Sequence, residues 1–309
     1  METKAALKPS DFVHLHNHTH HSLLDGLTKI PDLIARVKEL GMEACAITDH
    51  GTLSGTIEFY KAAKDAGIKP IIGIETYVAA RTIHDRDPAK DKARHHLILL
   101  AMNNTGYKNL MKLSTIANLE GVYYKPRVDH DLLEKYNEGI IAMSACLGGE
   151  VSAPLQDDDY EKAKKVASWY KSVFGDRYYL EIQDHQEYEL QNKVNNYLFQ
   201  LAEELGIKTV VSSDAHYVNA EDQQSHEILL CVGTGSFMSD EKRMSLTDFH
   251  LHVTDPKDVI ARWAAEHPET VSNTREIADR CNVEIDLGGI LIPKFPTPNG
   301  ESEKEYLDE

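Results

Sequence analysis

The chain has 309 residues, 41% of them hydrophobic, which is long enough for one large domain or two modest ones with a sizeable core. Its 33 Lys and Arg against 50 Asp and Glu give a formal net charge of −17, which argues against non-specific binding to duplex DNA. No run approaches the roughly 18 apolar residues of a membrane span, no signal peptide precedes the first expected strand, and the four cysteines follow no CxxC spacing, so we expect a soluble cytoplasmic protein.

Seven short apolar runs rich in strand-forming residues recur along the first 220 residues. In chain order they are 12–16 (FVHLH), 44–48 (ACAIT), 70–78 (PIIGIETYV), 97–102 (LILLAM), 139–145 (GIIAMSA), 178–182 (YYLEI) and 209–214 (TVVSSD). Helix-like segments separate most of them; in residues 28–41 the apolar side chains follow a helical stripe that ends at Gly41. This alternation predicts a parallel sheet, and the seven repeats predict an α/β fold closed as a distorted seven-stranded (β/α) barrel.

Two gaps between the runs, residues 79–94 and 120–138, are long enough to predict loops, which in a compact barrel are usually functional or disordered. After residue 220 the pattern changes to three helix-like segments. We therefore expect a barrel at 1–220 and a helical extension at 221–290. Residues 291–309 combine three prolines with many charges and predict a linker toward a further domain.

The first run belongs to a stretch that carries five histidines within residues 14–21. A purification tag or a non-specific metal-binding tract would lack the alternating apolar residues of this stretch, which favour a strand. His16 and His18 lie two residues apart, so both imidazoles face the same side of a strand and can hold one cation. His14 shares that side if the strand is straight, but it lies near the start, where we expect a structural role.

Residue types that bind metals also follow most of the other expected strands. They are Asp49 and His50, Glu75, Cys146, Asp184 and His185, and Asp214 and His216. Because the reactive groups of a β/α barrel lie at the carboxyl ends of its strands, we expect these side chains at one rim. Carboxylates, imidazoles and one thiol together favour a borderline divalent ion such as zinc, manganese or iron.

Several of these residues have a structural alternative. We expect Asp49 to cap the turn that follows it. Asp184 and His185 fit a ligand role and the start of the next helix equally well. Cys146 could be a core cysteine like Cys45, although its position directly after a strand favours a ligand. A nucleophilic role for Cys146 would need a neighbouring base, and the sequence identifies none.

The ordered motifs HLHNHT…SLLDG, AITDHG, GIE, HHLILLAMNNTGYKNL, YYKPR, SAC and SSDAH resemble those of the polymerase and histidinol phosphatase (PHP) superfamily. More closely, they resemble the amino-terminal PHP domain of the alpha subunit of bacterial DNA polymerase III. The similarity runs from about residue 11 to the end of the chain and includes LLCVGTGSFMSDEKRM and NTREIADRCNVEIDLG. It implies a distorted seven-stranded barrel that binds up to three divalent metal ions.

The resemblance also implies a set of nine ligands. They are His16, His18, Asp25, His50, Glu75, His96, Cys146, Asp214 and His216, with His95 as the alternative to His96. The implied grouping is His16, His18, Glu75 and Asp214 around one ion, Glu75, His96 and Cys146 around a second, and Asp25, His50 and His216 around a third. His96 begins its apolar run instead of ending it, which a purely parallel barrel does not explain. Zinc is the preferred metal because of the thiol, with manganese, iron or magnesium as alternatives.

Because the ligand set is complete, the resemblance implies that the domain is a metal-dependent phosphoesterase. The preferred activity is that of a 3′ to 5′ exonuclease, which removes nucleotides from DNA in proofreading. Metal-bound water would attack the phosphodiester, so no side-chain nucleophile is required. The expected partners are the 3′ end of single-stranded DNA, a polymerase domain of the same chain and replisome subunits, with no membrane.

The loop at 120–138 supplies the expected substrate-binding residues. Arg127 is the first candidate for phosphate, with Lys125 of the same loop and Arg81 of the loop at 79–94 as weaker ones, and Tyr123 or Tyr124 could stack on a base. The alternative for the loop at 120–138 is ordinary surface packing. Three other functions remain compatible with the sequence. They are a non-catalytic scaffold stabilised by metal, a small-molecule phosphatase of the histidinol phosphatase type, and an amidohydrolase, which Glu75 and Cys146 argue against.

Overall fold

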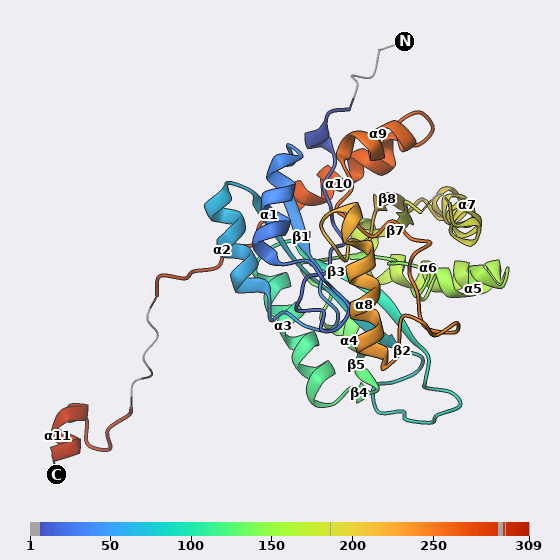
Figure 1. Cartoon of the computed structure of the whole chain (residues 1–309). Coiled ribbons are helices and arrows are strands. Elements are labelled where there is room, and N and C mark those ends of the chain that lie inside the picture. The colour runs from blue at the N-terminus through green and yellow to red at the C-terminus, as the bar shows by residue number, and fades with distance from the viewer. Residues whose placement is uncertain (1–6, 186, 290–292, 294, 309) are drawn as a thin grey trace.

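The computed structural model describes residues 7–185, 187–289, 293 and 295–308 (Figure 1). The strands are β1 (Ala44–Ile47), β2 (Lys69–Ala79), β3 (Arg94–Ala101), β4 (Val122–Tyr123), β5 (Lys125–Val128), β6 (Ile140–Met143), β7 (Tyr178–Gln183) and β8 (Lys208–Ser212). The first helices are α1 (Ile30–Glu39), α2 (Thr56–Ala66), α3 (Asn104–Leu119), α4 (His130–Lys135), α5 (Ser152–Gln156) and α6 (Tyr160–Phe174). They are followed by α7 (Glu189–Leu205), α8 (Gln223–Thr234), α9 (Pro256–Trp263), α10 (Pro268–Arg280) and α11 (Glu303–Asp308), and short 3-10 turns lie at Pro9–Asp11, Gly175–Arg177 and Ala220–Asp222.

The strands form one curled sheet in the order β1–β2–β3–β6–β7–β8, with β4 and β5 attached beside β2. The pairs β1–β2, β6–β7 and β7–β8 are parallel. β3, however, runs antiparallel to both β2 and β6. The expectation of an all-parallel sheet is therefore wrong for this strand. The physical reason is that residues 80–93 between β2 and β3 contain no helix, so the chain turns back on itself.

The seventh strand of the barrel is the extended segment 12–18, which is not a regular strand. It hydrogen-bonds to β1 on one side, where the Ala46 amide donates to the His14 carbonyl over 2.9 Å. On the other side it meets the chain just after β8, where the His18 amide donates to the Ala215 carbonyl over 2.7 Å and the Ala215 amide donates to the His16 carbonyl over 3.1 Å. This segment joins the two edges of the sheet, so the mixed α/β fold closes as the distorted seven-stranded barrel expected from the sequence.

The second long connection is more ordered than expected. Residues 120–138 were predicted to form a loop, but they contain the β4–β5 hairpin and helix α4. β5 continues the sheet by pairing in parallel with the end of β2. The prediction of a loop is wrong here because short strands with Lys and Pro at the edge of a sheet give only a weak sequence pattern.

Two buried clusters hold the fold together. The interior of the barrel contains alternate residues of the strands, such as Ile71, Ile98 and Val210, and is closed at one end by Ile277 and Ala278 of α10. A larger cluster lies between the sheet and the surrounding helices. Burial of the apolar stripe of α1 in this cluster explains the helical pattern of residues 28–41, and Gly41 ends it with a φ of 75°.

The helices after residue 220 pack directly on the barrel. The Thr274 hydroxyl of α10 accepts a hydrogen bond from the Val13 amide over 2.9 Å, and Val259 and Val271 are buried in the larger cluster. The domain boundaries at residues 220 and 290 stay a prediction.

In the expected linker, residues 291, 292, 294 and 309 lie outside the described ranges. Helix α11, which is described, has no buried residue. Within the described part of the chain, none of the helices has the length and apolar character to cross a membrane.

Arg127 of β5 joins the hairpin to the loop after β2. Its side chain is fully buried, and its guanidinium donates to the backbone carbonyls of Gly121, Ile83 and Asp85 over 3.0–3.1 Å. Its guanidinium carbon lies over the Tyr123 ring, 5.1 Å from the ring centroid. A buried cation held by carbonyl oxygens stabilises the loop by charge-assisted hydrogen bonds.

Replacing Arg127 with Ala should therefore lower the free energy of unfolding by about 3 kcal/mol, because several buried carbonyls lose their donor. The exposed Lys125 on the same strand is the matched control, and Lys125→Ala should change stability by less than about 0.5 kcal/mol. Urea denaturation of both variants measures this. Equal stability of Arg127→Ala and the wild type would contradict the structural role.

Candidate metal centre

The polar side chains of the site lie on the inward face of the strands. Along β2 the inward positions are Ile71, Gly73 and Glu75, and along β8 and the residues after it they are Val210, Ser212 and Asp214, so each strand changes from apolar to polar toward one end. The two-residue period of a strand directs all these side chains into the barrel. The apolar cluster fills the lower part of the barrel, and the polar groups form a layer above it.

Glu75 and Asp214 lie between the two histidines of the first segment. The Nε2 atoms of His16 and His18 are 3.1 Å apart. His16 Nε2 lies 3.5 Å from Glu75 Oε1 and 3.0 Å from Asp214 Oδ1, and His18 Nε2 lies 3.3 Å from Glu75 Oε2 and 3.2 Å from Asp214 Oδ1. Both ring nitrogens thus lie within 3.5 Å of a Glu75 oxygen and of Asp214 Oδ1, so the four side chains of the first implied ligand group lie close together.

The other implied groups are also brought together. His96 Nδ1 lies 2.9 Å from Glu75 Oε1 and 3.4 Å from Cys146 Sγ. At the mouth, His50 Nε2 lies 2.9 Å from Asp25 Oδ2. His216 Nε2 is 3.8 Å from Asp25 Oδ1. Pairwise contacts of 2.6–3.8 Å thus connect all nine predicted side chains into one cluster. Three overlapping groups of three donor atoms within 4.8 Å of one another lie in it, and the second and third differ from the implied groups: His16, His18 and Glu75; His50, Glu75 and His96; and His18, His50 and His216.

The reversed direction of β3 explains the position of His96. In an antiparallel strand the first residues, not the last, lie beside the carboxyl end of the neighbouring strand. His96 pairs with Tyr77 near the end of β2, which places its ring next to Glu75. His95 is its neighbour on the opposite face of β3, and burial lowers its pKa. The structure therefore places His96, and not His95, in the cluster.

Hydrogen bonds outside the cluster fix the orientation of three imidazoles. His16 Nδ1 lies 2.7 Å from Glu181 Oε1, and Glu181 also accepts a hydrogen bond from the Ser212 hydroxyl. His216 Nδ1 lies 2.7 Å from the carbonyl oxygen of Asp214. Since a carboxylate or carbonyl can only accept, these Nδ1 atoms carry the hydrogen and leave Nε2 free to bind a metal.

A similar chain orients His18. Asp49 accepts hydrogen bonds from the Thr19 amide (2.6 Å), the Thr19 hydroxyl (2.8 Å) and the Ser22 hydroxyl (2.7 Å). Ser22 Oγ in turn lies 3.0 Å from His18 Nδ1 and accepts its hydrogen. Asp49 therefore caps the turn after His18. The sequence suggested instead that it caps the turn that follows Asp49 itself. Glu181 was missed by sequence reasoning, although a glutamate inside the apolar run YYLEI was a visible signal.

The charges in the cluster compensate one another. Burial opposes the charged form of Glu75, but the imidazoles of His96, His50 and His16 outweigh it and keep its pKa well below the usual value. Burial also opposes protonation of His50, but Glu75 and Asp25 raise its pKa to about 9. The pKa of His16 is likewise raised by Asp214, Glu181 and Glu75 against the effect of burial. Divalent ions would take over the positive charge that these protons supply.

The donor atoms fit divalent ions. Glu75 Oε1, Glu75 Oε2 and Asp214 Oδ1 are buried and accept no hydrogen bond of acceptable geometry from the described residues. A buried carboxylate oxygen that accepts no hydrogen bond needs another positive partner, which here is a cation or a charged imidazole. The combination of imidazole, carboxylate and thiol groups is consistent with binding of a borderline divalent ion such as zinc, manganese or iron.

Left-handed backbone conformations concentrate at the site. Among the described non-glycine residues, five have a positive φ, and three of these are Leu24 beside Asp25, Ala145 beside Cys146, and Asp214 itself, with φ of 62°, 60° and 49°. Such conformations are uncommon for non-glycine residues and persist where the surroundings enforce them. Here they lie at or beside three of the predicted ligands, whose side chains point into the cluster.

The cluster opens on one side to a cavity of about 660 Å³. Asp25, His50 and His96 line its floor, and Lys92, Arg94 and Lys125 line its wall. Tyr124 lies beside Lys125 and is 64% exposed, but it does not line the cavity. Arg127 and Arg81 also lie outside it, since Arg127 is buried among carbonyl groups and Arg81 pairs with Asp91 at 2.6 Å. The cations available to a substrate are therefore Lys92, Arg94 and Lys125.

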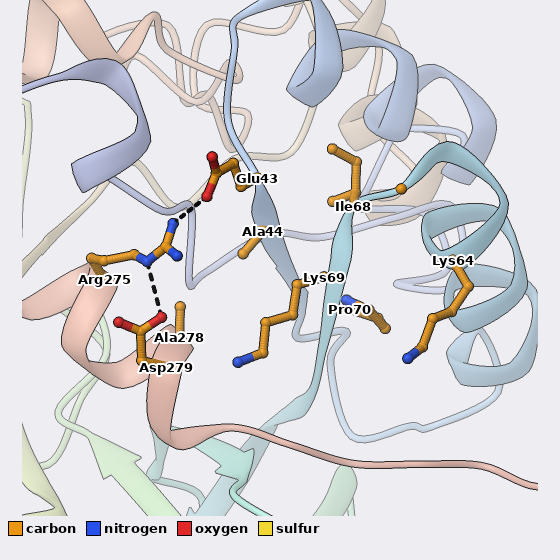
Figure 2. Close-up of a pocket in the computed structure, with 10 residues that line it drawn as sticks. Glu43, Ala44, Lys64, Ile68, Lys69, Pro70, Arg275, Ala278 and Asp279 are labelled. Atoms are coloured by element: carbon orange, nitrogen blue, oxygen red, sulfur yellow. Dashed lines mark hydrogen bonds and ion pairs between the residues drawn. The ribbon is translucent and has the colours of Figure 1, made fainter.

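A second cavity, of about 530 Å³, lies at the opposite end of β1 and β2. Figure 2 shows its walls, where Arg275 of α10 forms ion pairs with Glu43 and Asp279. None of the nine predicted ligands lines it. It lies beside α10 and the first residues of β1 and β2, at the end of the barrel that α10 closes.

The remaining sequence candidates have other positions. His14 points away from the cluster, and its Nε2 lies 2.9 Å from the Thr254 carbonyl oxygen. Asp184 forms an ion pair with Arg262 and accepts a hydrogen bond from the Trp263 indole, which gives it a structural role between β7 and α9. His185 is buried beside the cluster, and burial lowers its pKa to about 4.

The raised pKa of His50 predicts a pH dependence of stability in the metal-free protein. A group with a higher pKa in the folded state stabilises the fold below its unfolded pKa of 6.5, and this contribution disappears as the pH rises through about 9. The free energy of unfolding of chelator-treated protein should therefore fall by on the order of 2 kcal/mol between pH 6.5 and 9. Urea denaturation measures it. Zinc-loaded protein should show a smaller fall, and a flat profile without metal would contradict the charge compensation.

Glu181→Gln should weaken zinc binding by about 10- to 100-fold, because the His16 ring loses the carboxylate that orients it. Competition with a chromophoric chelator measures the affinity. Glu203→Gln, an exposed change on α7, is the control and should bind zinc like the wild type. Unchanged affinity in Glu181→Gln would show that the ring is oriented by other contacts.

Comparison with known proteins identifies relatives of this chain. A family model described as the PHP domain matches residues 14–185. The chain is 44% identical over 292 residues to the DNA polymerase III subunit alpha of Borreliella burgdorferi and 42% identical over 307 residues to that of Thermus aquaticus. The two alignments cover 94% and 96% of this chain but only 25% of each relative. The chain therefore spans about a quarter of the length of these relatives.

Among solved structures, a protein from Bifidobacterium adolescentis proposed to be a metal-dependent phosphoesterase is 15% identical, with a TM-score of 0.46 over 89% of this chain and 97% of that chain. The family match covers more than half of the chain, and the residues it includes carry seven of the nine clustered side chains. The chain belongs to the PHP domain family.

Proposed function

We propose that this PHP domain is a metal-dependent phosphodiesterase that removes nucleotides from the 3′ end of single-stranded DNA. The observation that carries the proposal is the cluster of nine side chains with metal-binding groups, in which Glu75 lies within 3.5 Å of four histidines and which opens on one side to a cavity lined by cations. Buried ligands alone would serve a structural metal, whereas an open side gives a substrate access to the ions.

Divalent ions bound by the three ligand groups would acidify water and neutralise the charge that builds up on the phosphoryl oxygens. The side chains of this protein would hold and orient those ions, with Glu75 shared between sites. Asp25 and His50 lie at the mouth, where the Asp25 side chain is 30% exposed. They are the ligands that a phosphoryl group would meet first.

The charge distribution supports a short single-stranded substrate. The body of the protein is strongly acidic, so long duplexes are repelled. Lys92, Arg94 and Lys125 form a local cationic wall within reach of the cluster, enough for a few phosphates. The exposed Tyr124 ring beside Lys125 offers a surface on which a base can stack. The choice of the 3′ end rests on the resemblance to polymerase PHP domains.

The relatives support the wider context of the proposal. Because they are alpha subunits of DNA polymerase III, we infer that this domain acts beside a polymerase domain of the same chain and proofreads its product. Zinc is the preferred ion because Cys146 belongs to the cluster. Manganese, iron and magnesium are the alternatives.

Asp25→Asn should reduce the rate of 3′-end degradation by about 100-fold or more, because the amide cannot supply the charge that Asp25 adds at the mouth of the site. The measurement is digestion of 5′-labelled and 3′-labelled oligonucleotides by the zinc- and manganese-loaded protein, together with its metal content. Asp65→Asn, an exposed carboxylate on α2, is the control and should keep full activity.

Three results would overturn the proposal. Absence of metal-dependent hydrolysis of any diester or monoester would leave a metal-stabilised scaffold. Turnover of phosphorylated metabolites alone would indicate a small-molecule phosphatase. Degradation from the 5′ end alone would refute the stated direction.

A further inference from the structure

His185 follows β7 and is a buried histidine that the ligand groups do not use. Its side chain is 1% exposed, and neither ring nitrogen has a hydrogen-bond partner among the described residues. A buried polar group without a partner destabilises a fold, so neither nitrogen is explained by folding alone. His14 is a contrasting case, because it is equally buried and its Nε2 lies 2.9 Å from the Thr254 carbonyl oxygen.

The His185 ring lies at the wall of a cavity of about 250 Å³ that it shares with the metal cluster. Asp25, His50, Asp214 and His216 line the same space. Yet His185 belongs to none of the groups of three donor atoms within 4.8 Å found among the described residues. Its ring therefore faces the space in front of the ligands without joining them.

The wall around His185 is apolar. Phe249 covers the ring edge-on, with 5.2 Å between the centroids and an interplanar angle of 88°. Leu246 and Leu251, from the segment between α8 and α9, line the same cavity, as does Met244. The cavity thus has metal ligands on one side and apolar side chains on the other, which fits a group with a charged end and an apolar body.

We propose that His185 binds the substrate by donating a hydrogen bond to a non-bridging oxygen of the phosphoryl group, and that this cavity is the subsite for the terminal nucleotide. The proposal rests on the function proposed above and adds a substrate-binding residue to it. The apolar wall excludes water around His185, so that a phosphoryl oxygen is the partner for its ring N–H. Phe249 and Leu246 would contact the body of the nucleotide.

The test compares His185→Leu, His185→Gln and the control His14→Leu in the zinc-loaded protein. Calorimetry with inorganic phosphate and with thymidine 5′-monophosphate measures binding, elemental analysis measures metal content, and urea denaturation measures stability. His185→Leu should weaken binding of both ligands about tenfold, the loss of one hydrogen bond. His185→Gln should restore part of the affinity because its amide can donate.

Stability separates this role from a structural one. His185→Leu should be at least as stable as the wild type, because it removes an unpaired polar group, and it should keep its full metal content. His14→Leu should be less stable and should bind phosphate normally. Wild-type affinity for phosphate in His185→Leu would overturn the proposal, as would loss of metal from that variant. These measurements need no turnover, so they fail or succeed independently of the exonuclease assay.

Discussion

The carboxylate of Glu75 is the group on which the rest of the site depends. It is 1% exposed and lies within 3.5 Å of ring nitrogens from four histidines. A buried carboxylate is tolerated only where positive charge compensates it. The barrel must therefore deliver histidines from the segment 12–18, from β3 and from the end of β1 to one point above its apolar interior. The same requirement makes the centre suitable for cations, since ions of charge two can take the place of the protonated rings.

The sequence predicts the elements of the fold better than their directions. Six of the seven expected strands form regular strands at the expected positions, and α1 and α8–α10 occupy expected helical segments. The reversal of β3 was not predicted because strand direction follows from the connection, and a helix-free loop such as 80–93 permits a return that apolar patterning does not reveal. The first run, 12–16, is extended but not a regular strand, although it hydrogen-bonds to β1 on one side and its continuation bonds to the chain after β8 on the other.

For the site, residue types at strand ends and the family resemblance identify the side chains that the structure brings together. They do not identify the residues that orient them. Glu181 and Ser22 act through hydrogen bonds to His16 and His18, and these contacts depend on neighbours 165 and 4 residues away in the chain. Arg127 shows the opposite case. A basic residue in a loop-like motif suggested phosphate binding, but the fold surrounds it with backbone carbonyls, an environment that the local sequence does not specify.

The closure of the barrel by residues 12–18 has a consequence for synthesis of the chain. The first ligands, His16 and His18, meet their partner Asp214 only after nearly 200 further residues have been added. Contacts of such long sequence separation form late and slowly. On the ribosome the nascent chain therefore carries an incomplete set of these side chains until the residues after β8 have emerged, so the cluster can assemble only as the tertiary fold is completed.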